Sequence, residues 1–133
     1  MNRHPYLRAY MAGILLPTLM LLVIVTALVV AHACYRLPDA IERAIVFPMA
    51  VVPNLWGLWN VLYQARPRLP IGIHGALLPI LLVPCGFALA RYFQLAFIPL
   101  PLAVLFTPVG MAAYYLVWKH LVSYLNGTIG LRS

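Results

Sequence analysis

The sequence has very few charged side chains, and acidic ones are nearly absent. Asp and Glu together number 2 among 133 residues, and all charged residues make up 8% of the chain, whereas soluble domains have about 25%. Hydrophobic residues make up 65%, and a chain this short buries only about two thirds of its surface on folding. A water-soluble fold would leave too much apolar surface in water. The composition therefore predicts an integral membrane protein with a single domain, residues 1–133.

Residues that usually carry catalysis or bind metals are also scarce. Cys34 and Cys85 form no CxxC pair, no His/Cys cluster has metal-ligand spacing, and no Gly-rich phosphate loop or Gly-x-Ser-x-Gly turn occurs. The two carboxylates, Asp39 and Glu42, lie on one short turn with two arginines, an arrangement typical of solvated ion pairs. We therefore predict that the protein is not an enzyme and has no catalytic residue, metal or cofactor.

What the sequence has instead is long stretches without charge. These hold 27 residues between Arg8 and Arg36, 22 between Arg43 and Arg66, 22 between Arg68 and Arg91, and 27 between Arg91 and Lys119. A helix crosses the hydrocarbon core with about 20 residues, and lipid offers backbone groups no partners, so each stretch must be helical. The sequence predicts an all-α protein, a compact bundle of four transmembrane helices with short loops. The predicted helices are residues 9–34, 43–64, 73–92 and 99–122, and prolines within them predict kinks.

The basic residues predict the orientation, because short cytoplasmic connections carry the excess of Lys and Arg. Three of the nine fall on one side of the predicted bundle and six on the other. The six are Arg3, Arg8, Arg66, Arg68, Lys119 and Arg132. Both termini are therefore predicted to be cytoplasmic, and the short connections suggest the cytoplasmic membrane of a bacterium.

Three amide side chains share one face of the second predicted helix, and we call Asn54, Asn60 and Gln64 the polar stripe. Polar groups within a membrane are expensive to bury and are functional candidates for that reason. The stripe has two interpretations. It could line a path for a small solute or ion beside the break at Pro53, or it could hydrogen-bond a neighbouring helix. We favour the second interpretation.

Aromatic rings recur near the predicted cytoplasmic ends of the second and fourth helices. Trp and Tyr favour the headgroup boundary, where the apolar ring points inward and the polar tip stays wet. We predict that four of them are interfacial anchors, namely Trp56, Trp59, Tyr63 and Trp118.

Small residues repeat along single faces of the predicted helices. In lipid, helices associate by close backbone packing, which small residues permit. We predict a helix-packing face in the third helix at Gly75, Gly86 and Ala90. Similar faces occur in the first helix, which includes Gly13, and in the second, which includes Gly57.

The remaining ionisable residues suggest no defined site. A pair of haem ligands would lie at one depth on facing helices. His74 and His120 fall at the same leaflet edge, but both are predicted to lie at the water boundary and not within the hydrocarbon. The net charge of +7 comes from basic residues scattered singly at the membrane boundaries. This pattern predicts attraction to lipid headgroups and no binding of nucleic acid.

Together these patterns predict an accessory or scaffolding subunit of a larger membrane complex or of a homo-oligomer, with the lipid bilayer as its surroundings. Two alternatives stay open. One is a component of a transporter or channel lined by the polar stripe, and the other is a pigment- or haem-binding membrane subunit. The chain has little mass outside the predicted spans, which disfavours a receptor or soluble-domain role.

Overall fold

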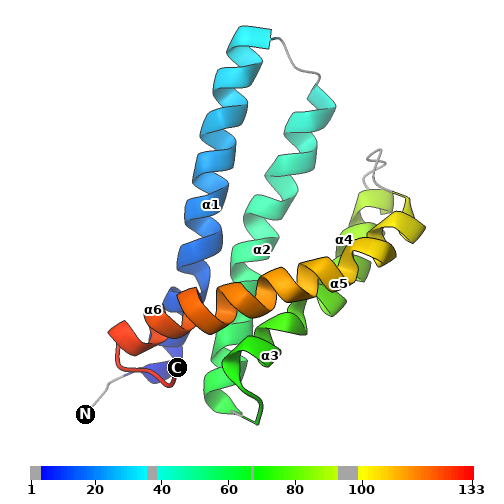
Figure 1. The fold of residues 1–133 in the computed structure, drawn as a ribbon. Helices are drawn as coiled ribbons and strands as arrows, with labels where there is room; N and C mark the ends of the chain where they lie inside the picture. The colour runs from blue at the N-terminus through cyan, green and yellow to red at the C-terminus, as the bar shows by residue number, and fades with distance from the viewer. Residues whose placement is uncertain (1–3, 36–38, 67, 93–98) are drawn as a thin grey trace. The chain divides into compact units, whose positions relative to one another are not determined.

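The computed structural model describes residues 4–35, 39–66, 68–92 and 99–133, and for residues 39–50, 89, 90, 92 and 100 it describes the backbone only. Every element in these ranges is helical. Figure 1 shows their order. The elements are α1 (Pro5–Tyr35), α2 (Asp39–Ala65), α3 (Ile71–Ala76), α4 (Leu78–Tyr92), α5 (Leu100–Val117), the π-helix η1 (Trp118–Val122) and α6 (Ser123–Thr128).

The helices confirm the prediction of a helical membrane protein. Among the residues with described side chains, three helical segments are long and apolar enough to cross a membrane: Pro5–Tyr35, Ile71–Ala88 and Pro101–Thr128. The first begins four residues before the predicted start and ends at Tyr35. The N-terminal part of α2 lies outside the residues whose side chains are described, and Asp39 and Glu42 lie in that part.

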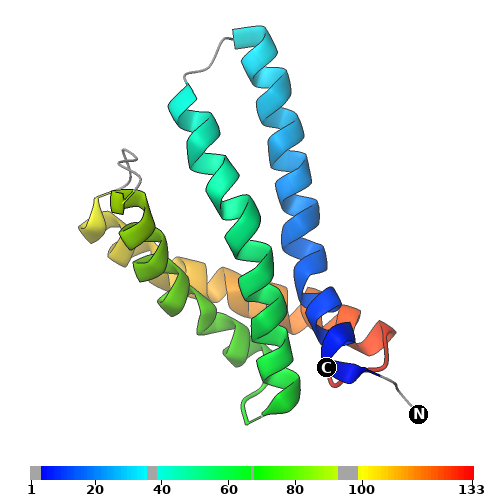
Figure 2. The ribbon, with the colours of Figure 1, turned by 180° about the vertical axis from the view of Figure 1, so that it is seen from behind.

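Chain contacts define two compact units, Met1–Leu62 and Tyr63–Ser133. We call them unit 1 and unit 2. Unit 1 contains α1 and most of α2, which run side by side as a hairpin (Figures 1 and 2). The buried residues of α1 are all near its beginning: Ala9, Ala12, Gly13 and Pro17. The packing of unit 1 is therefore concentrated at the N-terminal part of α1.

Two glycines let the backbones of α1 and α2 approach closely in unit 1. A Cβ atom on Gly13 would lie 2.7 Å from the carbonyl oxygen of Trp56 and 2.8 Å from Cα of Gly57. On Gly57 it would lie 2.6 Å from the ring of Tyr10 and 2.7 Å from Ile14. Neither position has room for a side chain, so both glycines are required by the helix crossing.

Unit 2 begins with the last residues of α2 and contains the remaining helices. Helix α5 packs against both α3 and α4, and η1 packs against α3. The predicted single helix 73–92 is interrupted at Leu77, between α3 and α4. Pro79 accounts for this break, because it has no N–H to donate to the carbonyl of Gly75. The amide of Ile80, the next residue, donates a hydrogen bond to the carbonyl oxygen of Leu77, three residues earlier, at 3.2 Å.

The last helical segment continues beyond its predicted end at residue 122, through η1 and α6 to Thr128. It ends in a Schellman motif. The amide of Leu131 donates to the carbonyl of Asn126 (2.8 Å), and that of Gly130 donates to the carbonyl of Gly127 (3.0 Å). Gly130 has a φ of 70°, which glycine adopts without steric cost. The cap turns the chain back at this point.

Candidate functional site

Asn60 is the most deeply buried member of the polar stripe. Its side chain is 0% exposed, and Nδ2 donates a hydrogen bond to the backbone carbonyl of Ala9 at 2.8 Å. The bond joins α2 to α1 next to the Gly13–Gly57 crossing, where the close backbones bring the amide within reach. A bond of this kind between helices in a membrane contributes about 0.6–2 kcal/mol.

Asn54 also bonds to α1, but at the surface. The hydroxyl of Tyr10 donates to Oδ1 of Asn54, and this contact is exposed. The ring of Tyr10 crosses directly over Gly57, so the missing side chain at Gly57 is what allows Tyr10 to reach Asn54. Asn54 and Asn60 therefore both act within unit 1, between the same two helices.

Gln64 belongs to unit 2 and has a different partner. Its Nε2 donates to the carbonyl oxygen of Arg132 at 2.7 Å, and its Oε1 accepts from the amide of Arg132 at 3.3 Å. One side-chain amide thus satisfies both backbone groups of a residue near the C-terminus. Two amides of the polar stripe thus bond to α1 within unit 1, and the third bonds to the C-terminal residues within unit 2.

A cluster of three rings forms in unit 2, and its centre is His74, which the sequence analysis placed at the water boundary of the predicted membrane span. His74 is 8% exposed, and Tyr63 and Trp118 are 3% and 0% exposed. The His74 ring centroid lies 5.4 Å from that of Tyr63 and 6.0 Å from that of Trp118. We call Tyr63, His74 and Trp118 the ring cluster.

Gly75 makes the ring cluster possible. A Cβ atom at this position would lie 2.0 Å from Cγ of Trp118 and 2.3 Å from its Cβ, so the indole packs directly on the backbone of α3. Trp118 is also the first residue of η1, and a π-helical turn widens the helix locally. The paired glycines Gly72 and Gly75, which fall on one face, are the sequence signal that could have indicated this contact.

The other residues of the predicted helix-packing face behave differently from Gly75. A Cβ atom on Gly86 would meet no atom within 4 Å, so this glycine makes no close contact within the described chain. The side chain of Ala90 lies outside the described residues. Only Gly75 of the three is at a close helix contact in the described structure.

Three of the four rings predicted to be interfacial anchors lie inside the protein. Trp56 is 5% exposed and, like Tyr63 and Trp118, belongs to the buried core, while Trp59 is half-buried. The anchor role stays a prediction for each of them. The structure adds that these rings contribute to the packing of the helices.

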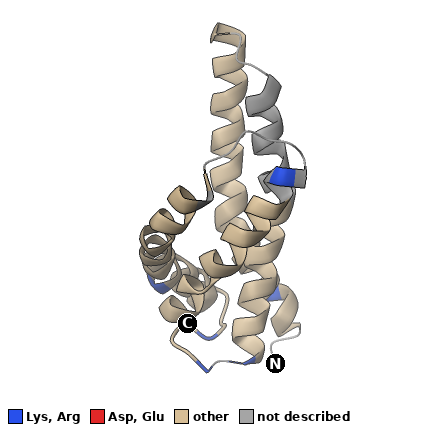
Figure 3. Cartoon of the chain, turned by 90° about the vertical axis from the view of Figure 1, so that its right-hand side faces the viewer, with Lys and Arg blue, Asp and Glu red and all other residues tan. Residues whose placement is uncertain are grey.

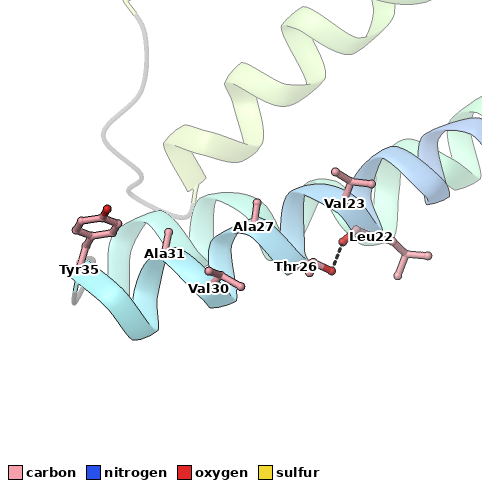
Figure 4. Close-up of a pocket in the computed structure, with 7 residues that line it drawn as sticks. All are labelled: Leu22, Val23, Thr26, Ala27, Val30, Ala31 and Tyr35. Carbon is pink, nitrogen blue, oxygen red and sulfur yellow. Dashed lines mark hydrogen bonds between the residues drawn. The ribbon is translucent and has the colours of Figure 1, made fainter.

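Apolar grooves occur on the surfaces of the described helices, and two of them include a threonine. The larger, about 610 Å³, is lined by residues of α1: Leu22, Val23, Thr26, Ala27, Val30, Ala31 and Tyr35 (Figure 4). The smaller, about 300 Å³, lies between α4 and α5 and includes Thr107. Each threonine hydroxyl donates to a carbonyl of its own helix, Thr26 to Leu22 at 2.8 Å and Thr107 to Ala103 at 2.9 Å. Both hydroxyls are thus occupied within their own helices, and the grooves suit apolar occupants.

Within the residues described, no group of three or more His, Cys, Asp or Glu side chains could hold a metal ion. Cys34 and Cys85 are both exposed and unbridged.

No family model, curated protein or solved structure matches this chain.

Proposed function

We propose that the protein is a non-catalytic integral membrane subunit that supports the assembly of a larger membrane complex or of a homo-oligomer. It crosses the bilayer four times, and both termini are cytoplasmic. Two observations support the proposal: the chain has long apolar helices, and part of α1 has no buried residues. The cytoplasmic membrane of a bacterium is the proposed location.

The fourth crossing is assigned to α2. At 1.5 Å per residue, the 27 residues of Asp39–Ala65 extend about 40 Å, which exceeds the hydrocarbon thickness of about 30 Å. The helix also bonds to α1 through Asn60 and crosses it at Gly57. Because α2 packs against α1, which is long and apolar enough to cross the membrane, we infer that α2 crosses the membrane beside it. Four crossings joined by short connections return the chain to the side on which it began.

The observation that carries the assembly role is the unpacked surface of α1. Residues 18–35 of this helix include no buried residue, and the α1 groove lies entirely within this stretch. Ala27 and Ala31 are one turn apart in the groove (Figure 4), and small residues at this spacing let another helix approach closely in lipid. The surface therefore supports association with the helix of another subunit.

A site-specific photo-crosslinker at Ala27, in native membranes, tests this role. Val29 is the matched control, because it lies at the same depth on the same helix, about 200° away around the axis, and is 62% exposed. The proposal predicts a discrete protein adduct at Ala27, either a dimer of this chain or a second protein, and none at Val29. Adducts with lipid alone at both positions would contradict an assembly role.

The hydrogen bonds of the polar stripe support packing over a solute pathway. A pathway would need the three amides to face one continuous space, whereas Asn60 and Asn54 bond to α1 and Gln64 bonds to Arg132. Flux in proteoliposomes tests the alternative directly. A pathway predicts solute or ion flux that Asn54→Leu abolishes, while the packing role predicts none. The haem or pigment alternative is tested by the visible absorption spectrum of protein purified from native membranes.

A further inference from the structure

Unit 2 gathers basic residues that are far apart in the sequence. The two hydrogen bonds from Gln64 hold the backbone of Arg132, and the Schellman motif at Gly130 directs the chain towards this contact. Arg66 follows Gln64 by two residues, so its Cα lies no more than about 8 Å from that of Gln64. The amide of Arg68 bonds to the carbonyl of Arg66 at 2.8 Å. Arg66, Arg68 and Arg132 are therefore held at one end of the unit.

A fourth cation reaches the same end through α3, which begins just after these arginines. A Cβ atom on Gly72 would lie 3.2 Å from Cβ of Lys119, so η1 passes close to the beginning of α3. The Lys119 ammonium lies over the ring of Tyr115, with Nζ 5.5 Å from the ring centroid. We call Arg66, Arg68, Lys119 and Arg132 the basic surface.

No acidic side chain of unit 2 can balance these charges, because the sequence contains no Asp or Glu from residue 63 to residue 133. All four basic side chains are exposed. Figure 3 shows Lys and Arg as blue segments beside the C-terminus and in the loop after α2. Cations held close together without an acidic side chain among them create a positive potential that an external anion relieves.

We propose that the basic surface binds the phosphate of anionic phospholipid headgroups. The surface adjoins helices that can cross a membrane: one membrane-spanning segment begins at Ile71, and the other ends at Thr128. Arg66, Arg68 and Arg132 therefore lie just outside these segments, where the helices reach the headgroups, and Lys119 lies beside the beginning of α3. Arginine forks match phosphate oxygens geometrically, and basic residues bordering a span attract anionic lipid. This inference depends only on membrane insertion and is independent of the assembly role.

If the proposal is correct, the uncharged side chain of Gln64 also affects lipid binding, because it holds Arg132 beside Arg66. The experiment titrates delipidated protein in neutral detergent with phosphatidylglycerol or phosphatidylcholine and counts bound lipids by native mass spectrometry. Wild-type protein retains phosphatidylglycerol in preference to phosphatidylcholine. Arg132→Gln, which leaves its backbone bonds to Gln64 in place, weakens phosphatidylglycerol binding about fivefold. Gln64→Leu, which leaves all four charges in place, weakens it about two- to fivefold.

Arg91→Gln is the charge-matched control. Arg91 is exposed near the end of α4, about 30 Å along the helices from Ile71, and its loss leaves phosphatidylglycerol binding unchanged. The proposal is overturned if Arg91→Gln weakens binding as much as Arg132→Gln, or if Arg132→Gln binds like the wild type in a monodisperse preparation. Inorganic phosphate at millimolar concentration should not displace the lipid. Displacement would identify a site for soluble phosphate and would also overturn the proposal.

Discussion

The two units pack their helices in different ways. In unit 1, α1 and α2 meet backbone to backbone at Gly13 and Gly57, and a buried amide, Asn60, bonds across the contact. In unit 2, an indole packs on a glycine backbone, Trp118 on Gly75, and two further rings complete the ring cluster.

The difference shows two solutions to one problem. Lipid tails are as apolar as leucine, so burial of apolar surface does not drive helices together within a membrane. Unit 1 gains close backbone contact and a buried hydrogen bond, while unit 2 gains the dispersion contacts of a large, fully enclosed ring. In each unit, glycine is the residue that permits the contact. Substitutions at these glycines therefore distinguish backbone-to-backbone packing from packing of a ring on the backbone.

The largest effect is expected at Gly75. A methyl group there would overlap Cγ and Cβ of Trp118, neither of which can move without displacing η1. Gly75→Ala should therefore lower the free energy of unfolding in detergent by about 3 kcal/mol. Trp118→Ala removes the overlap with Cγ but keeps the one with Cβ, so the double variant should lose less stability than the sum of the two single losses. Additive losses in the double variant would show that the two residues do not oppose each other.

Gly13→Ala should have a smaller effect, about 2 kcal/mol. Its added methyl group would meet backbone atoms of Trp56 and Gly57 at 2.7 and 2.8 Å, so α1 and α2 must separate slightly. Gly86→Ala is the control, because nothing lies within 4 Å of the added atom. It should leave stability unchanged or raise it slightly, since alanine favours helix. Equal destabilisation by both substitutions would show that the close approach of the backbones at Gly13 does not determine the effect.

Asn60→Leu is expected to have the smallest effect of the three, about 0.6–2 kcal/mol. It removes the bond to the Ala9 carbonyl and leaves that oxygen bonded within its helix only. Asn54→Leu removes an exposed bond to Tyr10 and should cost less. Thermal unfolding of both variants in one detergent measures the two losses of stability. A larger loss for Asn54→Leu would contradict the expectation that the buried hydrogen bond contributes more than the exposed one.

The long uncharged stretches predicted a helical membrane protein correctly, because lipid offers backbone groups no partners outside a helix. The sequence did not predict the interruption at Leu77 or the π-helix at Trp118, which depend on how proline and indole are accommodated by neighbouring segments. Small-residue periodicity indicated Gly13, Gly57 and Gly75 as well as Gly86. Periodicity identifies a face of a helix but not whether another helix covers it, and Gly86 is uncovered in the described chain.

The polar stripe shows the same limit. Helical spacing placed Asn54, Asn60 and Gln64 near one another on one helix, but each partner comes from a distant part of the chain. Gln64 bonds to a residue 68 positions away, and no local pattern encodes that pairing. His74 was considered only by its depth in the membrane, whereas its burial depends on Tyr63 and Trp118 from two other helices.

The topology of the chain is tested most directly by labelling single cysteines in intact membranes with a reagent that does not cross them. Cysteines are introduced one at a time at His4, Asp39, Arg68 and Ser133 of a variant in which Cys34 and Cys85 are replaced. Four crossings predict that Asp39→Cys is labelled from outside, and that His4→Cys, Arg68→Cys and Ser133→Cys are labelled only after the membranes are opened. Labelling of the two ends of the chain from opposite sides would contradict this account.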